Sequence, residues 1–143
     1  MTDSVHAASG LLVRNPDDLF DPAPLGYSHL AVAPSGARLV WIAGQAGGPD
    51  KGSFADQTRV ALANVGAAMR AAGGDIGGVA KLTVYIVDHD DAKHGTLIRA
   101  VDEAFGERLA PACTIVPLQR LGTSPDMLVE IEAFGILPRD TGR

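Results

Sequence analysis

Two glutamates near the end of the chain are the first candidates for chemistry. Glu130 and Glu132 lie two residues apart, between Leu128 and Phe134, so in a β-strand all four side chains would share one face. A carboxylate held among apolar neighbours has a raised pKa and can transfer protons near neutral pH. The same alternation is also typical of the solvated face of an antiparallel sheet. The pattern leaves both interpretations open.

The single cysteine is the second candidate. Cys113 follows Pro111 by two residues and opens a β-branched run. A lone cysteine is commonly a small buried hydrophobic residue, whereas a catalytic thiolate needs a nearby cation or helix N-terminus to lower its pKa. No His, Lys or Arg is adjacent to Cys113 in the sequence. The pattern by itself therefore favours a structural cysteine, with a nucleophile as the alternative.

Other polar and glycine-rich motifs do not indicate a cofactor or metal. The run DHDD at 88–91 has the composition of a helix N-cap, where acidic side chains complement the helix dipole. His89 and His94 are five residues apart and so do not share a helical face for chelation. The glycine clusters at 44–48 and 73–78 lack the spacing of a phosphate-binding loop. We expect no metal and no cofactor, and no spacing supports a Ser-His-Asp triad.

These candidates must be positioned by regular elements. Hydrophobic periodicity predicts helices over 54–72 and about 91–109, and strands over about 29–33, 38–43, 81–88, 113–119 and 127–137. Ser53 and Asp56 resemble a capping box before the first helix. Residues 43–53 are expected to form a Gly-rich loop, and residues 1–24, which contain three prolines, an irregular segment. The order β-β-α-β-α-β-β predicts a single α+β domain over 1–143, with a mixed sheet and both helices on one face.

Both faces of this predicted sheet carry many apolar side chains. In the strand 81–88, Leu82, Val84 and Ile86 alternate with Thr83, Tyr85 and Val87, and the strands 38–43 and 127–137 show a similar alternation. Two helices can cover only one of the two faces. We therefore expect the other face to pack against a second copy of the chain.

Composition narrows the class of protein further. The chain has 143 residues, 46% of them hydrophobic, and a net charge of −5 with scattered basic residues, which makes nucleic acid a poor partner. It has no apolar run long enough to span a membrane and no start typical of a secretory signal. One cysteine allows no internal disulfide. Together these features favour a cytoplasmic protein.

Several segments taken together are similar to the RidA/YjgF family, also called endoribonuclease L-PSP. Their order and spacing carry the resemblance over roughly residues 24–137. The matching segments are LGYS at 25–28, IAGQ at 42–45, NV at 64–65, KLTVY at 81–85, PACT at 111–114 and LVEIEA at 128–133, which resemble the family's G-P-Y-S, S-G-Q, L-x-N-V, K-x-T-V-F/Y, P-A-R-S/T and V-E-I-E-A motifs.

The resemblance implies a chorismate-mutase-like fold and a homotrimer with clefts between subunits. Family members that are deaminases hydrolyse small enamines and imines, such as 2-aminoacrylate and 2-iminobutanoate, to 2-keto acids and ammonia without a cofactor. Carried over by position, Glu130 would hold or activate water and Tyr27 would line the cleft. The backbone at Gly44 and Gln45 would help to seat the ligand.

Cys113 is the main departure from the family pattern. The resemblance places an arginine there, whose planar fork grips the substrate carboxylate; losing such a contact costs about 2–5 kcal/mol. Ala43 stands where serine is common, and near Ile98 the asparagine of the best-known deaminases has no equivalent. Arg120, at the far end of the strand, is the remaining candidate for a positive charge. We expect Cys113 to face the intersubunit cleft near Glu130, as a thiol or a thiolate.

Three functions remain in view. The first is a RidA-like hydrolase of small reactive imines or enamines whose substrate need not carry a carboxylate. The second is a non-catalytic trimeric protein that binds a small molecule or regulates through it. The third is the ribonuclease activity that the family's name suggests, which the acidic charge makes unattractive.

Overall fold

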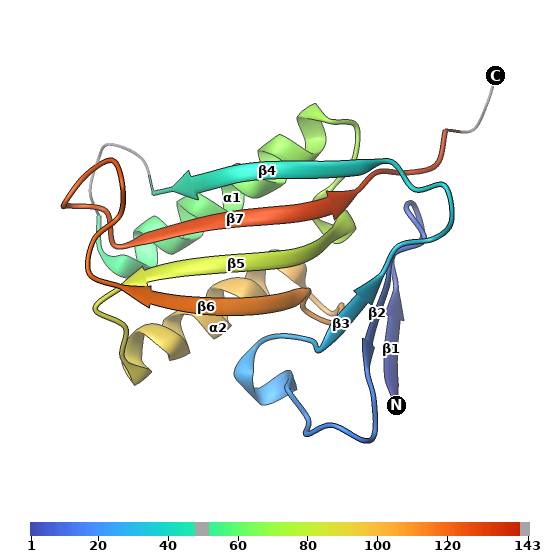
Figure 1. Cartoon of the computed structure of the whole chain (residues 1–143), viewed down its shortest axis with the longest axis horizontal. Helices are drawn as coiled ribbons and strands as arrows, with labels where there is room; N and C mark the ends of the chain where they lie inside the picture. Colours follow the sequence, from blue (N-terminus) through green and yellow to red (C-terminus); the bar gives the residue numbers. More distant parts are fainter. Residues whose placement is uncertain (48–51, 141–143) are drawn as a thin grey trace.

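A four-stranded mixed sheet with two helices across one face forms the body of the molecule (Figure 1). The computed structural model describes residues 1–47 and 52–140. The sheet has the order β4-β7-β5-β6, with β6 parallel to β5 and the other neighbours antiparallel. The α+β class and the placement of both helices on one face are confirmed. The elements are β4 (Leu39–Ala46), α1 (Phe54–Ala71), β5 (Val79–Val87), α2 (Asp91–Phe105), β6 (Ala112–Leu118) and β7 (Val129–Ile136).

The amino-terminal part of the chain forms a second, smaller sheet of three antiparallel strands (Figure 1). These strands are β1 (Thr2–Val5), β2 (Leu12–Asn15) and β3 (Leu30–Val32). The expectation of an irregular segment over 1–24 is therefore wrong for its first half. Its three prolines all follow β2, so they interrupt only the connection to β3, which contains the short helix η1 (Ala23–Leu25). Leu11 and Val13 are buried and pack beside Ala80 and Ile136.

The predicted strands at 29–33 and 38–43 exist but do not pair with each other. β3 pairs with β2, whereas β4 pairs with β7 and continues to Ala46. The predicted loop at 43–53 is correspondingly shorter, and its residues 48–51 lie outside the described part of the chain.

Local signals fix the helix ends. The Ser53 hydroxyl accepts a hydrogen bond from the Asp56 amide at 3.2 Å, and the Asp56 carboxylate accepts one from the Ser53 amide at 3.3 Å, which confirms the capping box. The Asp90 carboxylate caps α2 by accepting from the Lys93 amide at 2.8 Å. α2 ends at residue 105, earlier than predicted, because Gly106 takes a positive φ of 65° that stops the helix.

The alternation of side chains across the sheet is as predicted. The core between sheet and helices contains Leu82, Val84, Ile86, Val129 and Ile131, all fully buried. The opposite face carries the alternate residues, and there Trp41 is 71% exposed beside the ring of Phe134. In a single chain this second face is open.

Replacing the capping hydroxyl tests the local account of α1. Ser53→Ala should lower the free energy of unfolding by about 1 kcal/mol, because the Asp56 backbone amide loses its acceptor. Urea unfolding would measure the change. Ser35→Ala, in the exposed turn before β4, is the control and should leave the midpoint unchanged. Equal midpoints for both variants would contradict this account.

Candidate functional site

The Glu130 side chain lies directly over the backbone of Gly44. Glu130 is half-buried near the start of β7, with Ala46 of β4 and Tyr85 of β5 as its neighbours across the sheet. A Cβ added at Gly44 would come within 1.8 Å of the Glu130 Oε1 atom, so no larger residue fits there without moving the carboxylate. The structure thus brings together two of the predicted site residues.

A β-bulge creates this close approach. Between Ile42 and Gln45, β4 has one residue more than the facing stretch of β7, which bends the strand and turns its backbone toward the Glu130 side chain. The Gln45 side-chain amide donates a hydrogen bond to the Ala43 carbonyl at 2.9 Å and so braces the bulge. The residues predicted to seat a ligand, Ala43, Gly44 and Gln45, are therefore the bulge itself.

The two glutamates of β7 have different surroundings. Glu132 accepts a hydrogen bond from the Tyr85 hydroxyl at 3.0 Å, and this bond to Glu132 raises the pKa of Tyr85 above its usual value. No side chain in residues 1–47 and 52–140 donates a hydrogen bond to Glu130. Glu130 is therefore the carboxylate left available for a water molecule or a ligand.

Cys113 lies on the other face of the sheet. It pairs with Leu82 of β5, which pairs with Ala133 of β7, and these residues face the helices. Glu130 pairs with Tyr85 on the open face. The expectation that Cys113 and Glu130 approach each other is wrong within one chain, because the register of β6 puts the two side chains on opposite sides.

Cys113 instead lines a small pocket between β6, α2 and the loop after η1. The pocket has a volume of about 140 Å³, and it brings Cys113 together with Tyr27, another predicted site residue. Its lining consists of Leu25, Gly26, Tyr27, His94, Leu97, Ile98, Val101, Cys113 and Ile115. The sequence reasoning missed His94 as a pocket residue, although its spacing from Leu97, Ile98 and Val101 places it on the same helical face.

The side chains that line this pocket carry little charge. Burial raises the pKa of the Cys113 thiol from 9.0 to about 11, against a smaller opposing effect of the Lys81 charge. A thiol with this pKa is protonated at neutral pH. Among the described residues that line the pocket, none is a lysine or arginine.

Arg120 does not provide the missing charge to the pocket of its own chain. It is exposed and lies beyond the carboxyl end of β6, whereas Cys113 is near the amino end. Seven residues of extended chain separate the two by about 20 Å.

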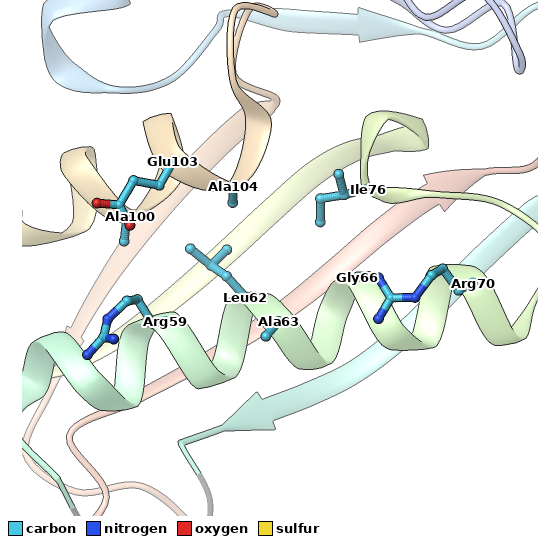
Figure 2. A pocket seen from close by; sticks show the side chains of 9 residues that line it. All are labelled: Arg59, Leu62, Ala63, Gly66, Arg70, Ile76, Ala100, Glu103 and Ala104. Atoms are coloured by element: carbon cyan, nitrogen blue, oxygen red, sulfur yellow. The ribbon is translucent and has the colours of Figure 1, made fainter.

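A groove between α1 and α2 lies apart from all predicted site residues (Figure 2). It has a volume of about 390 Å³ and a floor that includes Leu62, Ala63 and Ala100. Arg59 and Arg70 line it from α1 and Glu103 from α2, but Arg59 is paired with Asp56. This groove contains neither Glu130 nor Cys113, so it is separate from the candidate site.

Metal and membrane motifs are not found in the described part of the chain. No group of three His, Cys, Asp or Glu side chains is arranged there to hold a metal ion. No helix of residues 1–47 and 52–140 is long and apolar enough to cross a membrane.

The family model described as endoribonuclease L-PSP matches residues 21–137. A RutC family protein of Pyrococcus horikoshii is 38% identical over 120 residues, which are 79% of this chain and 89% of that protein. The chain belongs to the Rid/YjgF family. The resemblance drawn from the sequence motifs is thereby confirmed, together with the family fold.

Two solved structures of the family are also similar to this chain. The conserved Rid family protein YyfB from Yersinia pestis has a TM-score of 0.81 and 29% identity, covering 89% of this chain and 98% of that one. The structure of Escherichia coli TdcF with bound serine has a TM-score of 0.61 and 29% identity, covering 77% of this chain and 87% of that one.

The raised pKa of Cys113 predicts slow and strongly pH-dependent alkylation. At pH 7.5 the thiolate fraction is about a hundredfold smaller than for a thiol with a pKa of 9.0. The iodoacetamide rate should rise about tenfold per pH unit until roughly pH 11. Mass spectrometry over a pH series would measure it. A rate that levels off near pH 9 would mean that the thiol ionises normally.

Proposed function

We propose that this protein hydrolyses small reactive imines or enamines in a cleft between two copies of the chain, and that its substrate carries no carboxylate. The observation behind the proposal is the placement of the candidate residues in two groups. Glu130, on β7, lies over the bulge at Gly44 in the edge strand β4. Tyr27 and Cys113 lie at the other edge.

The sheet topology explains how two copies complete one site. β4 and β6 are the two edges of the four-stranded sheet. A head-to-tail interface that packs the open face beside the β4 edge of one copy against the β6 edge of the next would generate a ring where its rotation closes. It would bring the Glu130 carboxylate of one copy toward the pocket of the other. Family resemblance supports three copies, and the exposed Trp41 on the open face supports burial of that face.

Glu130 is suited to the proton transfers of imine hydrolysis. Its carboxylate would take a proton from water while the water oxygen attacks the carbon of the protonated C=N group, giving a neutral carbinolamine. The same group would return that proton to nitrogen. The C–N bond then breaks, ammonia leaves, and the hydroxyl proton passes back to the carboxylate as the carbonyl product forms. An enamine would first be protonated on carbon to give the imine. Gly44 allows this because a side chain there would displace the carboxylate.

The neutral pocket supports a substrate without a carboxylate. The family resemblance implies an arginine at position 113, whose fork would bind a carboxylate in two hydrogen bonds. The thiol of Cys113 is protonated near neutral pH, and the lining around it is mostly aliphatic. The TdcF structure holds serine, an amino acid with a carboxylate. By contrast, the pocket here favours imines of simple aldehydes or ketones.

Assembly is the first test. Light scattering at micromolar concentration should give a mass near three times the 14.8 kDa of one chain. Trp41→Glu should dissociate the assembly, because it buries a charge at the proposed interface. Val60→Glu, at an exposed site on α1, is the matched control and should leave the mass unchanged. A monomeric wild type would contradict an intersubunit site.

Turnover is the second test. Imines generated in solution from amines with and without a carboxylate should be hydrolysed faster with wild type, and the imines without a carboxylate should be preferred. Glu130→Gln should lower kcat/KM about a hundredfold or more, since it removes the proton acceptor. Glu107→Gln, just after α2, should have no effect. Carbonyl release coupled to a reductase would measure the rate.

Cys113→Arg separates the substrate classes. It should shift the preference toward 2-aminoacrylate and 2-iminobutanoate, because the arginine restores a carboxylate partner. Binding of imine analogues by calorimetry without acceleration of any imine by wild type would favour a non-catalytic binding protein instead.

A further inference from the structure

We infer that Phe20 and His29 are positioning residues that hold the Tyr27 ring at the mouth of the Cys113 pocket and thereby limit the size of the molecule that can enter. The inference rests on the proposed function only for the identity of that molecule. The positioning itself follows from contacts around Tyr27.

The backbone on both sides of Tyr27 is fixed to three different elements. Gly26 lies against α2, where an added Cβ would come within 2.9 Å of the Ile98 Cγ1 atom. The Ser28 amide donates a hydrogen bond to the Pro111 carbonyl at 3.1 Å. The His29 amide donates to the side-chain oxygen of Asn15, at the end of β2, at 2.9 Å. The segment cannot shift without breaking one of these contacts.

The Tyr27 ring is held differently from its backbone. Within the described residues, its hydroxyl has no hydrogen-bond partner, so the ring is held by packing. The Tyr27 and Phe20 rings lie edge to face with centroids 6.4 Å apart, and the His29 ring lies edge to face with both, at 5.7 Å from Tyr27 and 5.0 Å from Phe20. Edge-to-face pairs at these distances are attractive.

A hydrogen bond locks the cluster together. The imidazole Nε2 atom of His29 is 2.8 Å from the Phe20 carbonyl oxygen, so Nε2 carries a proton and donates it there. This bond links Phe20, in the loop after β2, to His29, which lies just before β3. The three rings therefore form one unit that spans the amino-terminal sheet and the pocket.

Phe20 is not part of the core. Its side chain is 60% exposed, and it precedes the residues that match the family model. Leu19, its neighbour in the same loop, is 50% exposed and takes part in none of these ring contacts. Phe20→Ala and Leu19→Ala are therefore a matched pair. Both remove an exposed apolar side chain, but only Phe20→Ala removes a contact with Tyr27.

Access to Cys113 measures the opening of the pocket without requiring turnover. The chain has no other cysteine, so methyl methanethiosulfonate as a small reagent and 2,2′-dithiodipyridine as a bulky one would both report on this thiol alone. At pH 9, Phe20→Ala and His29→Ala should each raise the bulky-to-small rate ratio about threefold to tenfold, because the Tyr27 ring loses an aromatic neighbour. Leu19→Ala should leave the ratio unchanged, and Phe20→Trp should restore it to the wild-type value.

The mobility of the ring itself provides a second measurement. The chain has two tyrosines, so 3-fluorotyrosine labelling gives two ¹⁹F signals, and Tyr85→Phe assigns them. Phe20→Ala should shift and sharpen the Tyr27 signal and leave the Tyr85 signal in place. An unchanged rate ratio together with an unchanged Tyr27 signal would overturn the inference. Neither measurement needs a substrate. The inference about Phe20 and His29 can therefore fail while imine hydrolysis is observed, and it can hold while hydrolysis is absent.

Discussion

The pleat of the central sheet is the constraint on which the site depends. Successive residues of a strand point to opposite faces, so the pairing of β6 with β5 and of β5 with β7 decides on which side each side chain lies. Here it puts Glu130 on the open face and Cys113 on the helix face. A single chain therefore cannot bring its acid and its thiol together, and a reaction that uses both environments requires a second copy at the edge of the sheet.

The bulge in β4 gives the acid its particular environment. A regular strand would continue the ladder past Glu130, and the pleat would place a side chain beside it. The extra residue between Ile42 and Gln45 bends the strand, and Gly44 leaves room for the carboxylate. In contrast, the Glu132 carboxylate, two residues further along, accepts a hydrogen bond from the Tyr85 hydroxyl. The two acids thus differ because the Glu130 carboxylate lies over Gly44, whereas the Glu132 carboxylate accepts a hydrogen bond from Tyr85.

The sequence alone was sufficient for elements with strong periodicity. The helices, the four strands of the main sheet and the alternation of their faces could all be predicted, because a 3.6-residue or two-residue period survives in a single sequence. The β1–β2 hairpin differs from the predicted irregular segment because the three prolines that indicate irregular chain all follow it. The separation of Cys113 from Glu130 was missed because strand register depends on pairing between distant segments, which periodicity within one strand does not determine.

The neutrality of the pocket and the rigidity of its mouth are connected. A pocket that binds its ligand through a charged fork can tolerate a loose entrance, since two directed hydrogen bonds fix the orientation of the ligand. A mostly aliphatic pocket with a protonated thiol has no such anchor, so selectivity must come from shape, and a difference of one methylene changes binding only modestly. Shape selects only if the walls stay in place. The absence of a charged side chain at position 113 therefore makes a fixed Tyr27 ring more important, and the contacts of Phe20 and His29 provide that fixation from outside the pocket.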